Sequence, residues 1–169
     1  MEDSHCYINT KKGDINNPDN YRGISLLNIG FKIYSKIITK RLTTIAEVIL
    51  LEELDRFRKG RSCMDCTFSA SQIIEKNWEF NIPTYIAFID FKKAYDSVDR
   101  DKLWTIILSK GIPTHLITII QKKYRENIIR VNAGNGISED SRAITQRVRQ
   151  GCPLSSVLFN VHLDEVIRI

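Results

Sequence analysis

Apolar residues recur with helical spacing in several parts of the chain. Residues 1–25 are polar and rich in turn formers, which predicts a loop or a hairpin. Asn28 can then cap a helix whose apolar residues recur every three or four positions: Phe31, Tyr34, Ile38, Leu42, Ile45 and Ile49. Lys32, Lys36 and Lys40 line another face of this helix, either as a solvated surface or as a row of cations that faces phosphates.

The middle of the chain predicts a second helix followed by a buried strand. After the basic, turn-like "DRFRKGRS", residues 66–80 fit a helix with Phe68, Ile73 (or Ile74) and Trp78 facing inward, and residues 81–83 break it. The segment 85–91 is short, continuous and rich in aromatic and β-branched residues. Such a run is typical of a central strand that is buried on both faces.

The rest of the chain predicts two helices, a hairpin and a final helix. Ser97 or Asp99 can cap a helix that ends at Gly111, and Pro113 can start the next one. Residues 128–148 resemble two strands joined by an Asn-Gly-rich turn at 132–136, and 152–169 form a helix with Pro153 near its first turn. This order favours an α+β fold over a regular βαβ array.

Composition places the chain among ordinary globular proteins and adds a slight preference for anionic partners. The chain has 169 residues, of which 43% are hydrophobic and 27% charged, and its formal net charge is +5. No apolar run approaches the roughly 18 residues of a membrane span, and the N-terminus has no apolar signal core. The sequence therefore predicts an intracellular protein, in the cytoplasm or the nucleus or both, that neither enters a membrane nor is secreted.

The cysteines offer only one close pair. The four are Cys6, Cys63, Cys66 and Cys152, and only "CMDC" at 63–66 has metal-ligand spacing. A zinc site normally needs a second such pair or histidines at a fixed spacing, and the three histidines are scattered along the chain. Ordinary reduced cysteines are therefore favoured over a metal-thiolate site.

Asp90 stands out because it ends the apolar segment "TYIAFID". An ionised carboxylate is costly inside an apolar layer, so the predicted strand must deliver it to the surface, to a cation or to a metal. One role is to hold Mg²⁺, which binds through one or two carboxylates together with substrate phosphates. The alternative is a strand-end aspartate that caps the next turn.

Four motifs, in order, resemble those of a known enzyme family. "FIDFKKAYDSVDRDKLW" and "RQGCPLSSVLFN" look like the first and second palm motifs of reverse transcriptases from non-LTR, LINE-like retrotransposons, which group II intron relatives share. "KKGDINNPDNYRGISLLNIGFKIYSKIITKRL" and "FRKGRS" resemble the two fingers motifs of this family. The resemblance runs from about residue 10 to about residue 165, and four ordered motifs are far more specific than any one of them.

The resemblance implies roles for the palm residues. The aspartate that matches Asp90 ligates two catalytic Mg²⁺ ions, about 4 Å apart, and the carbonyl that matches Phe91 assists it. Tyr95 matches the aromatic gate that lies under the incoming sugar and excludes a 2′-hydroxyl. Gln150 and Gly151 match the second palm motif, where glycine permits close approach of the backbone to the template–nucleotide pair.

The fingers motifs imply a set of cations. Lys12 and Arg22 fall where the family presents positive charge to the nucleotide triphosphate, and the planar guanidinium of arginine suits two-point phosphate binding. Arg58 and Arg61 match the basic second fingers motif, which lies near template and nucleotide. The alternative for all four is a role in solubility alone.

The resemblance implies a fingers-like segment at 1–83 and a partial palm at 84–169. Its activity is RNA-templated DNA synthesis from dNTPs, with an RNA template and a DNA primer as partners and Mg²⁺ as cofactor. The sequence ends at Ile169, just after the second palm motif, and no Asp-Asp pair occurs in it. The family's catalytic Asp-Asp hairpin and thumb are thus expected to be absent, and we expect this chain alone to be inactive.

The lack of an Asp-Asp pair and the expected absence of the thumb leave two alternatives to an active polymerase part. One is a remnant that has no catalytic activity but binds RNA or DNA through its basic fingers face. The other is a non-functional gene fragment, in which an incomplete palm sheet exposes apolar surface and an unpaired strand edge. The sequence leaves the element of origin and the oligomeric state open.

Overall fold

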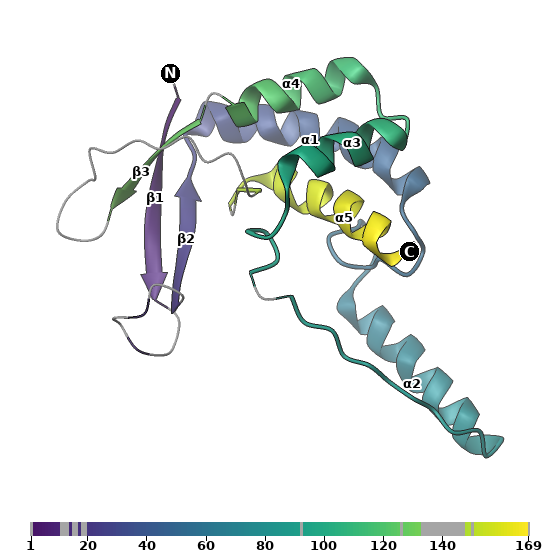
Figure 1. Cartoon of the computed structure of the whole chain (residues 1–169). Helices are drawn as coiled ribbons and strands as arrows, with labels where there is room; N and C mark the ends of the chain where they lie inside the picture. The colour runs from purple at the N-terminus through teal and green to yellow at the C-terminus, as the bar shows by residue number, and fades with distance from the viewer. Residues whose placement is uncertain are drawn as a thin grey trace.

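The computed structural model describes residues 2–10, 14, 17, 20–91, 93–125, 127–132, 148–149 and 151–168. Within them the structure has a small sheet beside a body of packed helices, from which one helix projects (Figure 1). The elements in chain order are β1 (Glu2–Thr10), β2 (Tyr21–Leu26), α1 (Ile29–Ile49), α2 (Cys63–Glu79), α3 (Arg100–Ser109), α4 (Thr114–Arg125), β3 (Asn127–Asn132) and α5 (Pro153–Ile167). The mixture of helices with one mainly separate sheet agrees with the α+β prediction.

The sheet has the strand order β2-β1-β3. β1 and β2 pair antiparallel with Tyr7 opposite Ile24, which confirms the hairpin predicted near the N-terminus. β3 confirms the first strand of the hairpin predicted at 128–148, and it pairs parallel with β1, so that Tyr7 also lies opposite Asn132. The second predicted strand and most of its turn fall outside the described residues.

The body consists of α1, α3, α4 and α5, which enclose the hydrophobic core. α5 packs against both α1 and α3, and α3 packs against α4. The largest almost fully buried apolar side chains come from these four helices and from the segments that connect them: Leu42, Leu103, Ile107, Ile120, Leu158, Val98, Val148 and Val161. Burial of Phe31, Ile38 and Leu42 confirms that most of the apolar stripe of α1 faces this core, but Tyr34 is exposed and the prediction is wrong there.

Helix ends lie where the capping signals predict them. The Asn28 side chain accepts a hydrogen bond from the Phe31 N–H at 2.6 Å, and the Asp99 side chain accepts from two N–H groups in the first turn of α3. α3 ends before Gly111, whose φ of +74° is a conformation that glycine adopts without strain. Pro153 is the first residue of α5.

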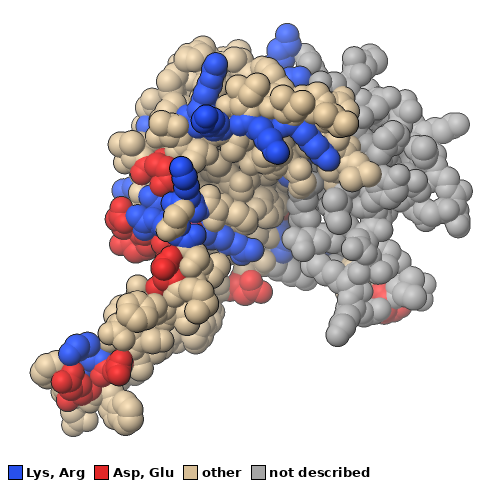
Figure 2. Space-filling view, turned by 180° about the vertical axis from the view of Figure 1, so that it is seen from behind, with Lys and Arg blue, Asp and Glu red and all other residues tan. Residues whose placement is uncertain are grey.

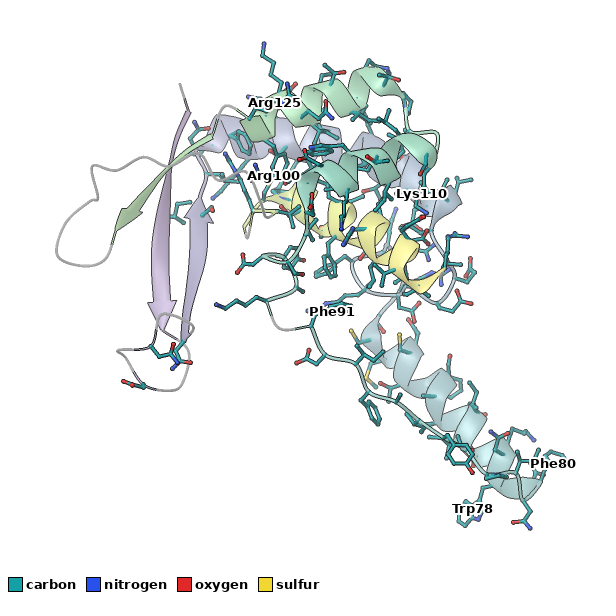
Figure 3. The ribbon with its side chains drawn as sticks, viewed as in Figure 1. Trp78, Phe80, Phe91, Arg100, Lys110 and Arg125 are labelled. Atoms are coloured by element: carbon teal, nitrogen blue, oxygen red, sulfur yellow. The ribbon has the colours of Figure 1, made fainter. Side chains whose placement is uncertain are left out.

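The helix α2 and the segment after it form an arm, defined as residues 63–91, whose burial was predicted wrongly. α2 itself confirms the predicted helix, but none of its residues is buried, and Phe68, Ile73 and Trp78 do not face inward; Trp78 is 83% exposed. Figure 3 shows Trp78 and Phe80 at the far end of the arm, away from the body. The buried central strand predicted at 85–91 is also wrong, because this segment has no regular structure.

Exposure of the arm has a simple physical reason. Periodicity shows which side chains share a face, but it carries no information about what covers that face. A strand needs a neighbouring strand for its hydrogen bonds, and among the described residues strands pair only as β1 with β2 and β1 with β3. Tyr85 and Phe88 are consequently 91% and 94% exposed.

None of the helices in the described part of the chain is both long enough and apolar enough to cross a membrane.

A buried carboxylate, Asp164 in α5, joins the ends of three helices. It is fully buried, yet every neighbour is a donor: Lys110 Nζ at 2.6 Å, Arg168 Nε at 2.7 Å and the Leu51 N–H at 2.7 Å. Lys110, which follows α3, also pairs with Glu165 at 2.9 Å. Burial alone would raise the pKa of Asp164, but the hydrogen bonds from Arg168, Lys110 and Leu51 outweigh it and lower that pKa to about 2.

We predict that Asp164→Asn lowers the free energy of unfolding by about 3 kcal/mol at pH 7, because two cations lose a buried partner. The folded-state pKa lies below the ordinary value of 3.8, so the contribution of the carboxylate is present above that value and is lost as pH falls toward 2. Urea unfolding between pH 2.5 and pH 7 measures both effects.

Glu165→Gln is the matched control, since it removes the partly exposed partner of the same lysine and should cost less than about 1 kcal/mol. The wild type should lose stability more steeply in acid than Asp164→Asn. If the stability of the two proteins fell equally between pH 7 and pH 2.5, the buried carboxylate of Asp164 would not be the group that stabilises the fold.

Candidate functional site

A tight turn at 93–97 presents Tyr95 to the body. Lys93 has a φ of +62°, an uncommon conformation for a residue with a side chain. Its carbonyl accepts hydrogen bonds from the N–H groups of Asp96 at 2.8 Å and Ser97 at 3.1 Å, and the Ser97 hydroxyl donates to the Ala94 carbonyl at 2.9 Å. These bonds close the first palm-like motif into a compact turn.

The turn packs against the second palm-like motif through aromatic rings. The Tyr95 ring centroid lies 5.2 Å from that of Phe159 in α5, with the two planes tilted by 36°. Phe91 meets the same Phe159 ring edge-on, with centroids 6.5 Å apart, and Figure 3 shows Phe91 where the arm joins the body. The Val148 N–H also donates to the Tyr95 carbonyl at 3.1 Å, so segments more than 50 residues apart are fixed together.

Gly151, three residues after Val148, packs against the strand β2. Its φ is +100°, and a Cβ atom placed there would lie 2.8 Å from the Ser25 carbonyl oxygen. A side chain therefore does not fit, because real Cβ atoms do not approach an oxygen so closely. β2 also contains Arg22, which lies opposite Asn9 in the register of the sheet.

Three predicted motifs thus converge: the first fingers motif at β2, the first palm motif at Tyr95 and the second palm motif at Gly151. The structure joins them through backbone contacts and one buried aromatic ring, Phe159. The side chain of Arg22 and the whole of Lys12 and Gln150 lie outside the described residues.

Two cations near this convergence were not among the predicted site residues. The Arg149 guanidinium is buried and lies 5.2 Å from the Phe31 ring centroid, while Lys123 Nζ lies 5.3 Å from the same ring and 5.1 Å from the Tyr34 ring. Cations above aromatic rings are stabilised by the ring quadrupole. The position of Arg149 next to Gln150 could have indicated it, whereas Lys123 had no signal beyond the basic last turn of α4.

The predicted template cations Arg58 and Arg61 make contacts within the protein. Arg58 is buried: it pairs with Glu47 at 2.9 Å and donates to the carbonyls of Leu51 and Leu54. Arg61 pairs with Glu52 and with Asp55. Both arginines brace the loop between α1 and α2 in this structure, and their contact with nucleic acid stays a prediction.

Asp90 is exposed on the segment of the arm that returns from the end of α2. Among the described residues no three His, Cys, Asp or Glu side chains are grouped so that they could hold a metal ion. The described side chains thus do not form a Mg²⁺ site around Asp90, and its role as a metal ligand stays a prediction.

Comparison with known families decides the ancestry. A family model described as "Reverse transcriptase (RNA-dependent DNA polymerase)" matches residues 10–169. The chain belongs to the reverse transcriptase family. The contacts of Phe91 and Tyr95 with Phe159 therefore join two segments of a reverse transcriptase chain that are distant in sequence.

The relatives of this reverse transcriptase chain are proteins of mobile elements. It is 27% identical over 161 residues to the "Retrovirus-related Pol polyprotein from type-1 retrotransposable element R2" of Popillia japonica, and 28% identical over 169 residues to the protein of the same name from Nasonia vitripennis. It is 25% identical over 156 residues to the "Transposon TX1 uncharacterized 149 kDa protein" of Xenopus laevis. These alignments cover 93%, 98% and 91% of this chain but only 22%, 16% and 12% of those relatives.

We predict that Gly151→Ala lowers the free energy of unfolding of this reverse transcriptase chain by at least about 2 kcal/mol, through backbone strain and overlap with Ser25. Gly60→Ala is the matched control, since Gly60 has a φ of +75° with open space around its Cα and should cost only about 1 kcal/mol. Urea unfolding compares the two. Equal losses would show that the approach of Gly151 to β2 is not tight.

Proposed function

We propose that this chain is a part of a retrotransposon polymerase that copies RNA into DNA. In this proposal residues 1–83 belong to the fingers and residues 84–169 to the upstream part of the palm. The observation that carries it is the convergence of β2, Tyr95 and Gly151, because nucleotide selection requires the fingers and both palm motifs to meet at one point. Membership of the reverse transcriptase family supports the reaction class.

The proposed role of Tyr95 depends on rigidity. A gate that excludes a 2′-hydroxyl must not move aside, and the Tyr95 ring is held by Phe159 while its carbonyl accepts the Val148 N–H. We assign the Gly151 backbone, which lies against the Ser25 carbonyl of β2, to contact with the template–nucleotide pair. We assign Lys12 and Arg22 to the nucleotide triphosphate, Gln150 to the nucleotide pair, and Arg58 and Arg61 to the template side.

Asp90 is proposed as one ligand of the catalytic Mg²⁺, with the Phe91 carbonyl beside it. Mg²⁺ bound there would supply positive charge for the transferred phosphate and lower the pKa of the attacking hydroxyl. One carboxylate compensates only part of the charge of two such cations. The proposal therefore places the complete catalytic site in a longer polypeptide.

We predict that this chain alone incorporates no dNTP on an RNA template with a DNA primer and Mg²⁺, because Asp90 is the only one of its carboxylates that we assign to the metal site. Primer extension with labelled primer measures this. If the wild-type chain extends the primer and Asp90→Ala does not, the claim that the metal site is incomplete is wrong. The matched Asp96→Ala variant tests whether such a loss is specific to Asp90.

Binding of nucleic acid by this chain itself is a second candidate function, favoured by the lysine row of α1, defined as Lys32, Lys36 and Lys40. All three are exposed and none pairs with an acidic side chain in the described part of the chain. Successive members are separated by about 6 Å along the helix axis, which is similar to the spacing of successive phosphates along a strand. Figure 2 shows Lys and Arg side chains spread over the upper part of the body, with acidic side chains below them.

We predict that changing the lysine row to glutamine weakens binding to single-stranded RNA and makes the slope of log affinity against log salt shallower by about 2, since three phosphate contacts are lost. Fluorescence anisotropy at several salt concentrations measures this slope. The matched control removes equal charge elsewhere, as Lys59→Gln, Lys76→Gln and Lys102→Gln together. If the two triple variants had equal effects, the lysine row would contribute to binding only through the overall charge of the chain.

A further inference from the structure

The pair Cys63 and Cys66 lies at the start of α2 and is not used by the proposed polymerase function. Cys63 is the first residue of the helix and Cys66 follows one turn later, so both face the same side. Both are free thiols exposed to solvent. A small oxidant can therefore reach them in the folded protein.

Asp55 distinguishes the two thiols. Cys66 Sγ donates a hydrogen bond to Asp55 Oδ2 at 2.8 Å, and the same carboxylate is paired with Arg61 Nη1 at 3.3 Å. The side chain of Asp55 is only 13% exposed, so water competes poorly for it. The hydrogen bond to Asp55 raises the pKa of the Cys66 thiol, and the same bond lowers the pKa of Asp55.

These contacts argue for redox chemistry rather than metal binding. The described residues supply no third His, Cys, Asp or Glu side chain in a metal-holding arrangement with this pair. The hydrogen bond holds the Asp55 carboxylate where it can receive the Cys66 proton as that sulfur attacks its neighbour. Because the pKa of Asp55 is lowered and that of Cys66 is raised, the proton is transferred during the attack and not before it.

We propose that Cys63 and Cys66 are a dithiol site that hydroperoxides oxidise to a disulfide, with Asp55 as the proton acceptor of Cys66. Cys63 sulfur attacks the peroxide, the O–O bond breaks, and an alcohol or water leaves while Cys63 becomes a sulfenic acid. Cys66 sulfur then attacks Cys63 sulfur, its proton passes to Asp55, and the S–O bond breaks as Asp55 returns this proton to the leaving hydroxide, which departs as water. The two thiols lose two electrons and the peroxide gains them.

Oxidation would change how the arm is attached. The Cys66–Asp55 hydrogen bond joins α2 to the loop that Arg58 and Arg61 brace, and a sulfur in a disulfide has no proton to donate. Side chains three residues apart on a helix have Cβ atoms about 5 to 6 Å apart, whereas a disulfide needs about 3.5 to 4.5 Å. The first turn of α2 must therefore tighten, which makes the arm sensitive to oxidation.

The test treats the reduced full chain with hydrogen peroxide and follows each cysteine by peptide-resolved mass spectrometry, with dimedone to trap sulfenic acid. In the wild type we expect a Cys63–Cys66 disulfide and no dimedone on Cys63, whereas Cys66→Ser should carry dimedone on Cys63. Buried Cys152 serves as an internal control and should stay reduced. Uniform oxidation of the cysteines, or no disulfide at 63 and 66, would overturn the proposal.

Asp55→Asn separates proton transfer from a structural role. It should slow disulfide formation by at least about tenfold and let dimedone accumulate on Cys63, and Asp55→Glu should recover part of the rate. Arg61→Gln is the matched control, because it removes the other partner of Asp55 but leaves the acceptor in place. The same rate in Asp55→Asn as in the wild type, or equal slowing by Arg61→Gln, would contradict the role of Asp55.

Discussion

Asp164 holds the ends of three helices together, and the arrangement of the body depends on it. Its carboxylate accepts from the Leu51 N–H just after α1, from Lys110 just after α3 and from Arg168 at the end of α5. Arg168 also donates to the Ile49 carbonyl at 2.9 Å, which is otherwise a free end group of α1. A carboxylate buried to this degree is tolerated only because each of its oxygens has donors, so any other relative position of the helices would leave a charge unpaired.

Two of these helices, α1 and α5, are also held together at their N-terminal ends. β2 leads into α1 and Gly151 precedes α5, and the approach of Gly151 to Ser25 brings these two starts together. α1 and α5 are therefore held at both ends, by an ionic contact at one and by a backbone contact at the other. This arrangement places Phe159 where it contacts the rings of Tyr95 and Phe91. The meeting of the segments that carry the predicted motifs thus follows from the packing of the body.

The arm has no such fixing along most of its length. It is attached at its two ends, through the Cys66–Asp55 hydrogen bond at the start of α2 and through the contact of the Phe91 and Phe159 rings, while its far end carries exposed Trp78 and Phe80. Asp90 is exposed on the returning segment and directly precedes Phe91, so the proposed metal ligand lies beside the ring contact that joins the arm to α5. A site completed by further carboxylates would gain its rigidity from them or from strands that cover the apolar residues of the arm.

The sequence alone determined where the helices end and to which family the chain belongs. Asn28, Asp99, Gly111 and Pro153 predicted helix ends correctly, because caps and helix breakers act within a few residues, and four ordered motifs identified the family that the comparison confirms. It did not determine what covers an apolar face: the segment 85–91 and the α2 residues Phe68 and Trp78 look like core but are exposed. Nor did it indicate that Asp164 joins three helices, that Arg58 is buried, or that Gly151 touches β2. These contacts join residues far apart in sequence, so only the tertiary structure could decide them.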